Sequence, residues 1–331
     1  MNLKFLVPVV MVLIGVRARA SGYSTEVWNA MTKGAGFDVS FQVVDDEGNS
    51  VAGAKCSGWM AIEQARNHGS GYEKSTDTNG CVRIVGKCSE WFSLIVQKDG
   101  FYTTSLEVKY PARDTTPSLA DGKWQPYGET RTVVLKKIKN PWAVKVHTDE
   151  QRHRKIPAFD QWLPFDMEVS DWLSPYGNGV HNDVLLRFNK AGSGRVGDFA
   201  FTMDACFTNN PYAGFYCKPS DVFSDLRTDY CADTNADYCT DYRFMIDAFG
   251  KGRVKEMGLA KDSYLVFRTR TRVDENGRLI GAHYGKYCGG WRSDNTELHL
   301  GAGCFNPVEN DTNIEGNQPL LYKIRNYKNK K

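Results

Sequence analysis

The chain has 331 residues, of which 42 are basic and 39 are acidic, a formal net charge of +3. Three of the positive charges, Lys4, Arg17 and Arg19, lie in the first 20 residues, so the rest of the chain is neutral. Strong nonspecific binding to nucleic acid needs a clustered basic surface, and the composition therefore argues against a nucleic-acid partner.

The N-terminus has the pattern of an export signal. Lys4 precedes an apolar run over residues 5–16 and a small-x-small site that ends at Ala20. These are the three parts of a cleavable signal peptide. The run is shorter than the roughly 20 apolar residues of a membrane-spanning helix. We expect a signal peptide at residues 1–20 and a mature chain that is secreted, periplasmic or extracellular, with no membrane span.

Residues 36–137 predict a domain of short strands and tight turns. Apolar and polar residues alternate from Phe37 to Val44, the period of a half-buried strand. Further strands are expected at residues 51–56, 81–85, 91–96 and 132–135. Because turn chemistry separates these segments and no helix is convincing, we predict a mainly β fold that begins with an antiparallel β-sandwich.

Three segments of this domain carry a recognisable turn pattern: residues 44–54 (VDDEGNSVAGA), 76–80 (TDTNG) and 96–101 (VQKDGF). They resemble the turns of the carboxypeptidase-regulatory-like domain, a prealbumin-like β-sandwich. The resemblance covers about a third of the chain and implies an accessory or spacer domain, since the pattern concerns fold rather than chemistry. Residues 110–129 depart from it and are expected to form an insertion or a loop over the sheet.

A linker at residues 136–141 leads to a second, β-rich domain at residues 142–331, which resembles no family. Strands are expected at residues 184–188, 199–203, 264–270 and 298–300, with a hairpin turn at residues 273–277. A short helix is expected at residues 220–226.

Nine cysteines follow the expected signal peptide. In an exported protein they predict structural disulfides, and the odd number leaves at least one thiol free, bridged between chains or otherwise bound. Cys81 and Cys88 lie roughly 23 Å apart on a straight strand, too far for a bridge. Unless Gly86 turns the chain, one of them is expected to pair with Cys56. The oligomeric state is left open.

Aspartates recur every fourth residue from Asp221 to Asp241. Within this run, oxygen-bearing side chains at alternate positions predict a Ca²⁺ site. The alternative is a plain polar loop, because Tyr238 and Phe244 occupy the EF-hand glycine and glutamate positions. A zinc site of cysteines with His283 or His299 lacks the usual C-x₂₋₄-C spacing. The proposed Ca²⁺ ligands are Asp233, Asn235, Asp237 and Asp241.

The sequence contains no clear catalytic motif. Ser193 lies between glycines without the G-x-S-x-G elbow, and a carboxylate pair of the glycosidase kind could come from Asp166, Glu168, Asp171 or Asp183. Aromatic residues in loops often stack on sugar rings, whereas Trp59, Trp91 and Trp142 lie near strand patterns and are expected in the core. The candidate ligand-binding residues are Trp124, Tyr127, Trp162, Trp172, Tyr176 and Trp291.

These observations lead to a secreted, non-enzymatic binding protein whose partner is a carbohydrate or a protein surface. Two alternatives stay open: a secreted hydrolase with its site in the second domain, and a structural subunit of a cell-surface assembly. No cofactor is expected other than Ca²⁺.

Overall fold

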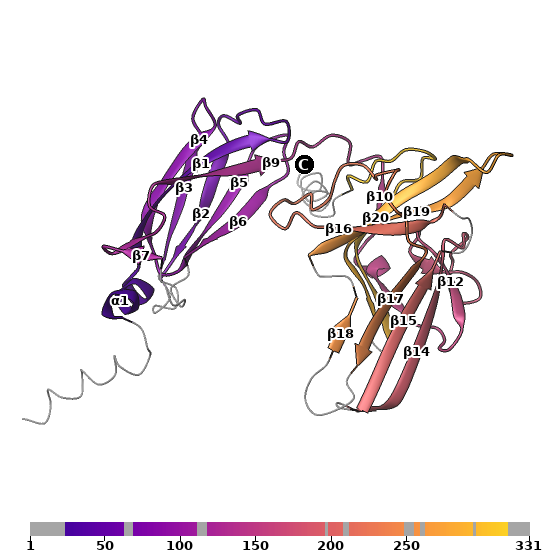
Figure 1. Ribbon diagram of the computed structural model, residues 1–331. Helices are drawn as coiled ribbons and strands as arrows, with labels where there is room; N and C mark the ends of the chain where they lie inside the picture. The colour runs from indigo at the N-terminus through magenta and orange to yellow at the C-terminus, as the bar shows by residue number, and fades with distance from the viewer. Residues whose placement is uncertain are drawn as a thin grey trace, which may run out of the picture. The chain divides into compact units, whose positions relative to one another are not determined.

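The computed structural model describes residues 24–62, 69–110, 118–195, 198–207, 212–247, 255–258, 262–293 and 296–316. The expected signal peptide at residues 1–20 therefore lies outside the described residues. The chain divides into two compact units, a first unit at Met1–Lys137 and a second unit at Ile138–Lys331 (Figure 1). In the described part of the chain, no helix is long and apolar enough to cross a bilayer. Both units consist mainly of β-strands, which confirms the predicted fold class.

The first unit contains two sheets. One has the order β4-β1-β8-β7, with β9 also paired to β1, and the other has the order β3-β2-β5-β6. The first sheet is mixed, because β1 pairs with β9 and β8 in parallel and with β4 antiparallel. The strands are β1 (Ala35–Asp45), β2 (Lys55–Ala61), β3 (Gly69–Ser75), β4 (Cys81–Cys88), β5 (Trp91–Gln97), β6 (Thr104–Lys109), β7 (Leu119–Ala120), β8 (Lys123–Trp124) and β9 (Glu129–Leu135).

Alternation along the strands builds the core of the first unit. Phe37, Val39, Phe41 and Val43 of β1 are fully buried, and they share one apolar cluster with residues of β2, β4 and β5. A helix that the sequence did not indicate, α1 (Thr25–Lys33), adds three buried side chains to this cluster. It begins at an N-cap serine, Ser24, whose hydroxyl accepts a hydrogen bond from a first-turn N–H.

The second unit also contains two sheets. One has the order β10-β21-β20-β19-β16, with β11 also paired to β21, and the other has the order β13-β12-β14-β15-β17-β18. The strands are β10 (Lys145–Val146), β11 (His153–Lys155), β12 (Trp162–Asp166), β13 (Asp171–Trp172), β14 (Val184–Arg195), β15 (Asp198–Cys206), β16 (Gly214–Pro219), β17 (Asp241–Asp247), β18 (Lys255–Met257), β19 (Ser263–Val273), β20 (Leu279–Ser293) and β21 (Glu297–Phe305), and η2 (Glu150–Arg152) is a 3₁₀ turn.

Two apolar clusters lie in the second unit. The larger one joins residues of both sheets, among them Phe188 of β14 and Leu265 of β19. The smaller one combines β16, β19 and β20 with Ala232 and Ile314, which belong to irregular segments. The long polar segment between β16 and β17 is therefore packed against the sheet. Its expected helix at residues 220–226 is absent, because Asp221 accepts the N–H groups of Phe223 and Ser224 in a turn.

Candidate functional site

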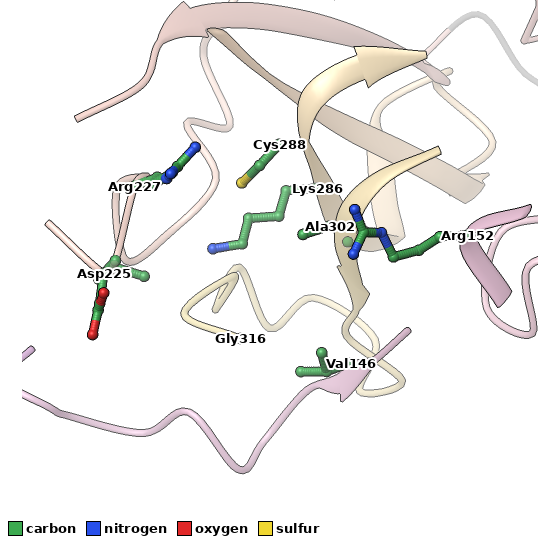
Figure 2. A pocket seen from close by; sticks show the side chains of 10 residues that line it. Val146, Arg152, Asp225, Arg227, Lys286, Cys288, Ala302 and Gly316 are labelled. Carbon is green, nitrogen blue, oxygen red and sulfur yellow. The ribbon is translucent and has the colours of Figure 1, made fainter. Parts of the chain in front are cut away.

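A pocket of about 330 Å³ opens in the second unit. Residues from β10, η2, β20 and β21 line it, together with the segment at residues 225–227 and Gly316 (Figure 2). Three of its ten lining residues are cationic (Arg152, Arg227 and Lys286) and one is acidic (Asp225). The pocket is therefore positively charged, and the sequence analysis identified none of these cations.

Lys286 is the most unusual of the three cations. It lies on β20 on the same face as Ala282 and Tyr284, two members of the smaller apolar cluster, because alternate residues of a strand share a face. The side chain is only 2% exposed. Its ammonium donates a 2.6 Å hydrogen bond to the Thr228 hydroxyl. The described residues contain no ion pair to Lys286, so a buried charge faces a neutral partner.

Cys288 follows two positions further along β20 and faces the same pocket. Figure 2 shows its thiol and the Lys286 side chain pointing in the same direction, with Arg227 on one side and Arg152 on the other. Burial raises the pKa of the Cys288 thiol, while the charges of Lys286, Arg227 and Arg152 act in the opposite direction. Burial dominates, so the thiol stays protonated near neutral pH.

The remaining cations of the pocket are less enclosed. Arg152 forms a 2.9 Å ion pair with Asp149 and is 29% exposed, and Arg227 is exposed. A guanidinium binds carboxylate and phosphate oxygens in a fixed, forked geometry. The arrangement thus offers one buried ammonium and two guanidinium groups to a small anion.

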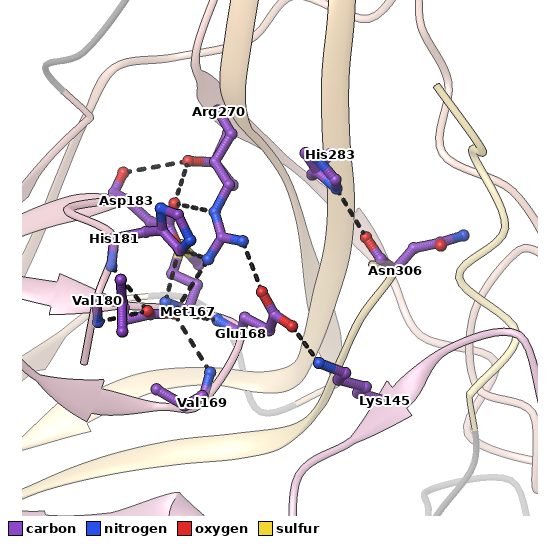
Figure 3. A network of polar contacts seen from close by, with 12 residues as sticks. Lys145, Met167, Glu168, Val169, Val180, His181, Asp183, Arg270, His283 and Asn306 are labelled. Carbon is purple, nitrogen blue, oxygen red and sulfur yellow. Dashed lines mark hydrogen bonds and ion pairs between the residues drawn. The ribbon is translucent and has the colours of Figure 1, made fainter. Parts of the chain in front are cut away.

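The carboxylates that the sequence offered as a catalytic pair have a different role. Three of the four lie around Arg270 (Figure 3). The Arg270 guanidinium donates to both Asp183 oxygens at 3.0 and 3.1 Å, to Asp166 at 3.2 Å and to Glu168 at 2.6 Å. Asp171 instead accepts the N–H groups of Trp172 and Asn178.

This arginine cluster is saturated with hydrogen bonds. Asp166 also accepts four backbone N–H groups, Asp183 accepts that of Met167, and Glu168 pairs with Lys145. Burial raises the pKa of Asp183, whereas Lys145 and Arg270 outweigh burial and lower that of Glu168. Because Asp166 and Asp183 are only 2% and 1% exposed, a substrate cannot reach them. The cluster ties β19 to the β12 end of the other sheet.

Half of the six predicted ligand-binding aromatics are core residues. Trp124 stacks on Tyr110 and donates its indole N–H to the Cys88 carbonyl, and Trp172 donates its indole N–H to the Lys155 carbonyl. Trp291 is 1% exposed and packs against Tyr242 and Phe207. Burial in the sheet cores leaves these rings no free face for a sugar, which corrects the prediction.

The other three aromatics are exposed. Trp162 and Tyr176 are 41% and 44% exposed in the second unit, whereas Tyr127 belongs to the first. Trp59 and Trp142, which were expected in the core, are instead exposed.

The aspartate run does not gather its carboxylates. Asp233 accepts the N–H of Asn235 at 3.0 Å, and Asp241 accepts the Thr240 hydroxyl at 2.7 Å. Among the described residues, the groups of three or more His, Cys, Asp and Glu ligand atoms within 4.8 Å of one another do not include Asp233, Asp237 or Asp241. The prediction of Ca²⁺ bound by these residues with Asn235 is not supported, because the carboxylates do not converge on one point.

The expected disulfides are not present, since all nine cysteines are free thiols in the structure. β4 pairs with β1 without a break from Cys81 to Cys88, so Gly86 does not turn the chain. Burial raises the pKa of Cys56 to about 11 and that of Cys88 to about 12. Both thiols therefore remain protonated inside the apolar core, where they behave as small hydrophobic side chains.

No protein-family model and no curated protein sequence matches the chain. Among solved structures, it matches 3-chlorocatechol 1,2-dioxygenase from Rhodococcus opacus at 15% identity and a TM-score of 0.25, over 32% of this chain and 61% of that one. Catechol 1,2-dioxygenase from Acinetobacter radioresistens matches at 16% identity and 0.24, over 32% and 53%. Hydroxyquinol 1,2-dioxygenase from Pseudomonas putida matches at 17% and 0.23, over 33% and 58%.

The matched part thus spans less than two thirds of each dioxygenase. All three of these proteins are dioxygenases. The comparison gives no support to the prediction of a non-enzymatic protein that binds carbohydrate or a protein surface, and that prediction is not retained. At such low identity and TM-score the likeness assigns no activity to this chain, whose described residues belong to a mainly β fold of two units.

Proposed function

We propose that the second unit binds a small anion, a molecule that carries a carboxylate or a phosphate group, in the pocket around Lys286. The observation that carries the proposal is the 2% exposure of Lys286 together with its neutral partner Thr228. Burying an ammonium away from water is costly unless an opposite charge accompanies it. A bound anion would supply that charge.

The size and composition of the pocket support a small molecule rather than a polymer. A volume of about 330 Å³ is at the lower end of the range for small-molecule sites. Asp225 is the one acid among the lining residues, and Asp149 pairs with Arg152, so the three cations still exceed these two carboxylates by one. An anion would occupy the space between Lys286 and the two arginines, with Cys288 beside it.

The role of Lys286 can be tested with Lys286→Met in the full chain. Binding of inorganic phosphate and of succinate is measured by calorimetry, with glucose as a neutral probe. We expect the unaltered chain to bind at least one of the two anions but not glucose, and Lys286→Met to lose that binding. Lys190→Met removes an exposed lysine from the same unit and should bind normally.

Two further measurements separate a ligand site from a structural lysine. Because methionine carries no charge, Lys286→Met should be as stable as the unaltered protein or more stable. If Lys286 had a structural role instead, Lys286→Met should be less stable. Arg227→Gln changes an exposed residue and should weaken anion binding without affecting folding. Bound phosphate or succinate should also slow alkylation of Cys288. Equal binding in all variants, or no binding of either anion, would refute the proposal.

We also propose that the chain is exported and that the first unit belongs to the carboxypeptidase-regulatory-like domains. The signal pattern at residues 1–20 and the three turns at residues 44–54, 76–80 and 96–101 support this. N-terminal sequencing of protein recovered from a secreting host should begin at Ser21. Retention of the chain inside the cell with Met1 intact would contradict export.

A further inference from the structure

A cluster of two histidines and a glutamate lies on β11 and the neighbouring strand β21. The two strands are antiparallel, with His153 opposite His299 and Lys155 opposite Glu297. Residues that face each other across a ladder point to the same side, as do residues two apart on one strand. Leu298 and Leu300 are buried in the larger apolar cluster, so the alternate positions Glu297 and His299 face away from it. His153, Glu297 and His299 therefore share one outer face.

The ligand atoms of these three residues converge. His153 Nδ1 and His299 Nδ1 are 2.9 Å apart, and His153 Nδ1 is 4.0 Å from a Glu297 carboxylate oxygen. One ligand atom from each residue can be chosen so that all lie within 4.8 Å of one another. The two imidazole rings are nearly perpendicular, at 84°.

We propose that His153, Glu297 and His299 bind a divalent first-row transition metal ion. With metal–nitrogen bonds of about 2.1 Å, two ligands at a right angle are about 3.0 Å apart, and at the tetrahedral angle about 3.4 Å. The separation of 2.9 Å between the imidazole nitrogens matches the right-angle arrangement. Two histidines and one carboxylate on a single face leave the other coordination positions open to water or another ligand.

The surroundings of the three residues indicate which cations they favour. Lys155 lies opposite Glu297, and Arg292 of β20 lies opposite His299. The region is therefore not an acidic cluster that would attract any cation by charge. Binding would depend on the imidazole lone pairs, which suit zinc, cobalt, nickel or iron and not Ca²⁺ or Mg²⁺.

This metal site is independent of the anion pocket but close to it along the chain. Arg152, which lines the pocket, is the neighbour of His153, and its side chain donates a 3.5 Å hydrogen bond to the Leu300 carbonyl next to His299. The inference does not rest on the proposed anion binding, and either can fail without the other.

The test uses the full chain without a polyhistidine tag, freed of metal with EDTA. Zn²⁺ and Co²⁺ are titrated by calorimetry and visible spectroscopy, with Ca²⁺ and Mg²⁺ as controls. We expect one equivalent of Zn²⁺ or Co²⁺ to bind, and neither Ca²⁺ nor Mg²⁺. His153→Gln and His299→Gln should weaken binding by about tenfold or more, since even residues around a ligand set can change affinity by that amount.

Two controls keep the result interpretable. His181→Gln alters an exposed histidine outside the cluster and should bind like the unaltered chain. The nine thiols are a competing set of ligands, but thiolate ligands give Co²⁺ an intense near-ultraviolet charge-transfer band that histidine and carboxylate ligands do not. Such a band, equal binding in all variants, or no binding of either ion would overturn the proposal. The last outcome would leave the 2.9 Å contact as a hydrogen bond between the two imidazoles.

Discussion

The two units differ in how far their charged side chains and ion-pair partners are buried. Among the described residues of the first unit, the buried charged side chains are Asp38 and Asp45, and their partners Arg83 and Lys137 extend toward water, with exposures of 66% and 35%. In the second unit, Lys286 is 2% exposed and the Arg270 side chain 17%, and Asp166 and Asp183 are almost fully enclosed. Both units are mainly β, so fold class does not explain the difference.

We interpret this contrast as one between a scaffold and a unit that carries a ligand site. In the first unit the buried carboxylates Asp38 and Asp45 pair with cations that reach water, and its interior is filled by apolar strands. Two arrangements of buried charge in the second unit differ in the partner of the buried cation. Around Arg270 every charge has a partner, whereas at Lys286 the partner is a hydroxyl. We interpret the first arrangement as structural and the second as a site for a ligand.

The largest effect is expected from Arg270→Met. Removing the arginine leaves Asp166, Asp183 and Glu168 without their shared cation, and breaking a buried ion pair costs about 3–5 kcal/mol. Hydrogen exchange followed by mass spectrometry should show protection lost in β12, β14 and β19 and retained in β1 and β4. Part of the loss should be recovered at acidic pH, because burial raises the pKa of Asp183 and its protonation removes an unpaired charge.

The matched control is Arg83→Met in the first unit. Its guanidinium pairs with Asp38, but water screens an exposed arginine, so the loss of stability should be clearly smaller. If Arg83→Met cost as much as Arg270→Met, the contrast between the units would not hold.

A second, smaller effect is expected in the dependence of stability on pH. His147 is 1% exposed, and burial lowers its pKa to about 4. The unfolded chain binds a proton at His147 below about pH 6.5, whereas His147 of the folded chain stays neutral down to about pH 4. The contribution of neutral His147 to the free energy of unfolding is therefore fully present above pH 6.5. It is lost as the pH falls to 4, in total about 3 kcal/mol. Urea denaturation at a series of pH values should show this slope in the second unit.

The slope, rather than the absolute stability, identifies His147. His147→Leu should flatten the dependence between pH 6.5 and 4.5, whereas His181→Leu, which alters an exposed histidine, should leave it unchanged. Asp38 and Asp45 cannot produce it, because their partners lower their pKa values and their contribution is lost only at more acidic pH. An unaltered slope in His147→Leu would show that another group is responsible.

The sequence predicted the parts of the fold that depend on strand period and turns. The alternation at residues 37–44 lies within β1, and the expected strands at residues 81–85 and 91–96 lie within β4 and β5. β3 was missed because its residues GSGYEKS are polar and lie mostly on the surface, so no alternation marks it. α1 was missed because it is a short helix, stabilised by packing rather than by a long apolar stripe.

The candidate sites were less predictable, because they depend on contacts between distant segments. Lys286 lies in the glycine-rich stretch of β20, where neither face reads as apolar, so the sequence did not indicate that this lysine is buried. Its partner Thr228 is 58 residues away. His153 and His299 are 146 residues apart and meet only through the register of β11 and β21. The prediction that aromatic residues in loops bind a ligand was wrong for Trp124 and Trp172. A tryptophan near a glycine or a proline can also point into the core, as these two do.

The wall of the anion pocket has a further consequence. Ala302 contributes only a methyl group to it, and Gly303 and Gly316 line it with backbone atoms. A larger side chain at position 302 would shorten the pocket without disturbing Lys286 or either arginine. One methylene more or less against a hydrophobic wall typically changes discrimination between ligands by about 1–3 kcal/mol. The charge that selects anions and the volume that selects among them are therefore encoded at different positions, and ligand preference could diverge between related chains by single substitutions.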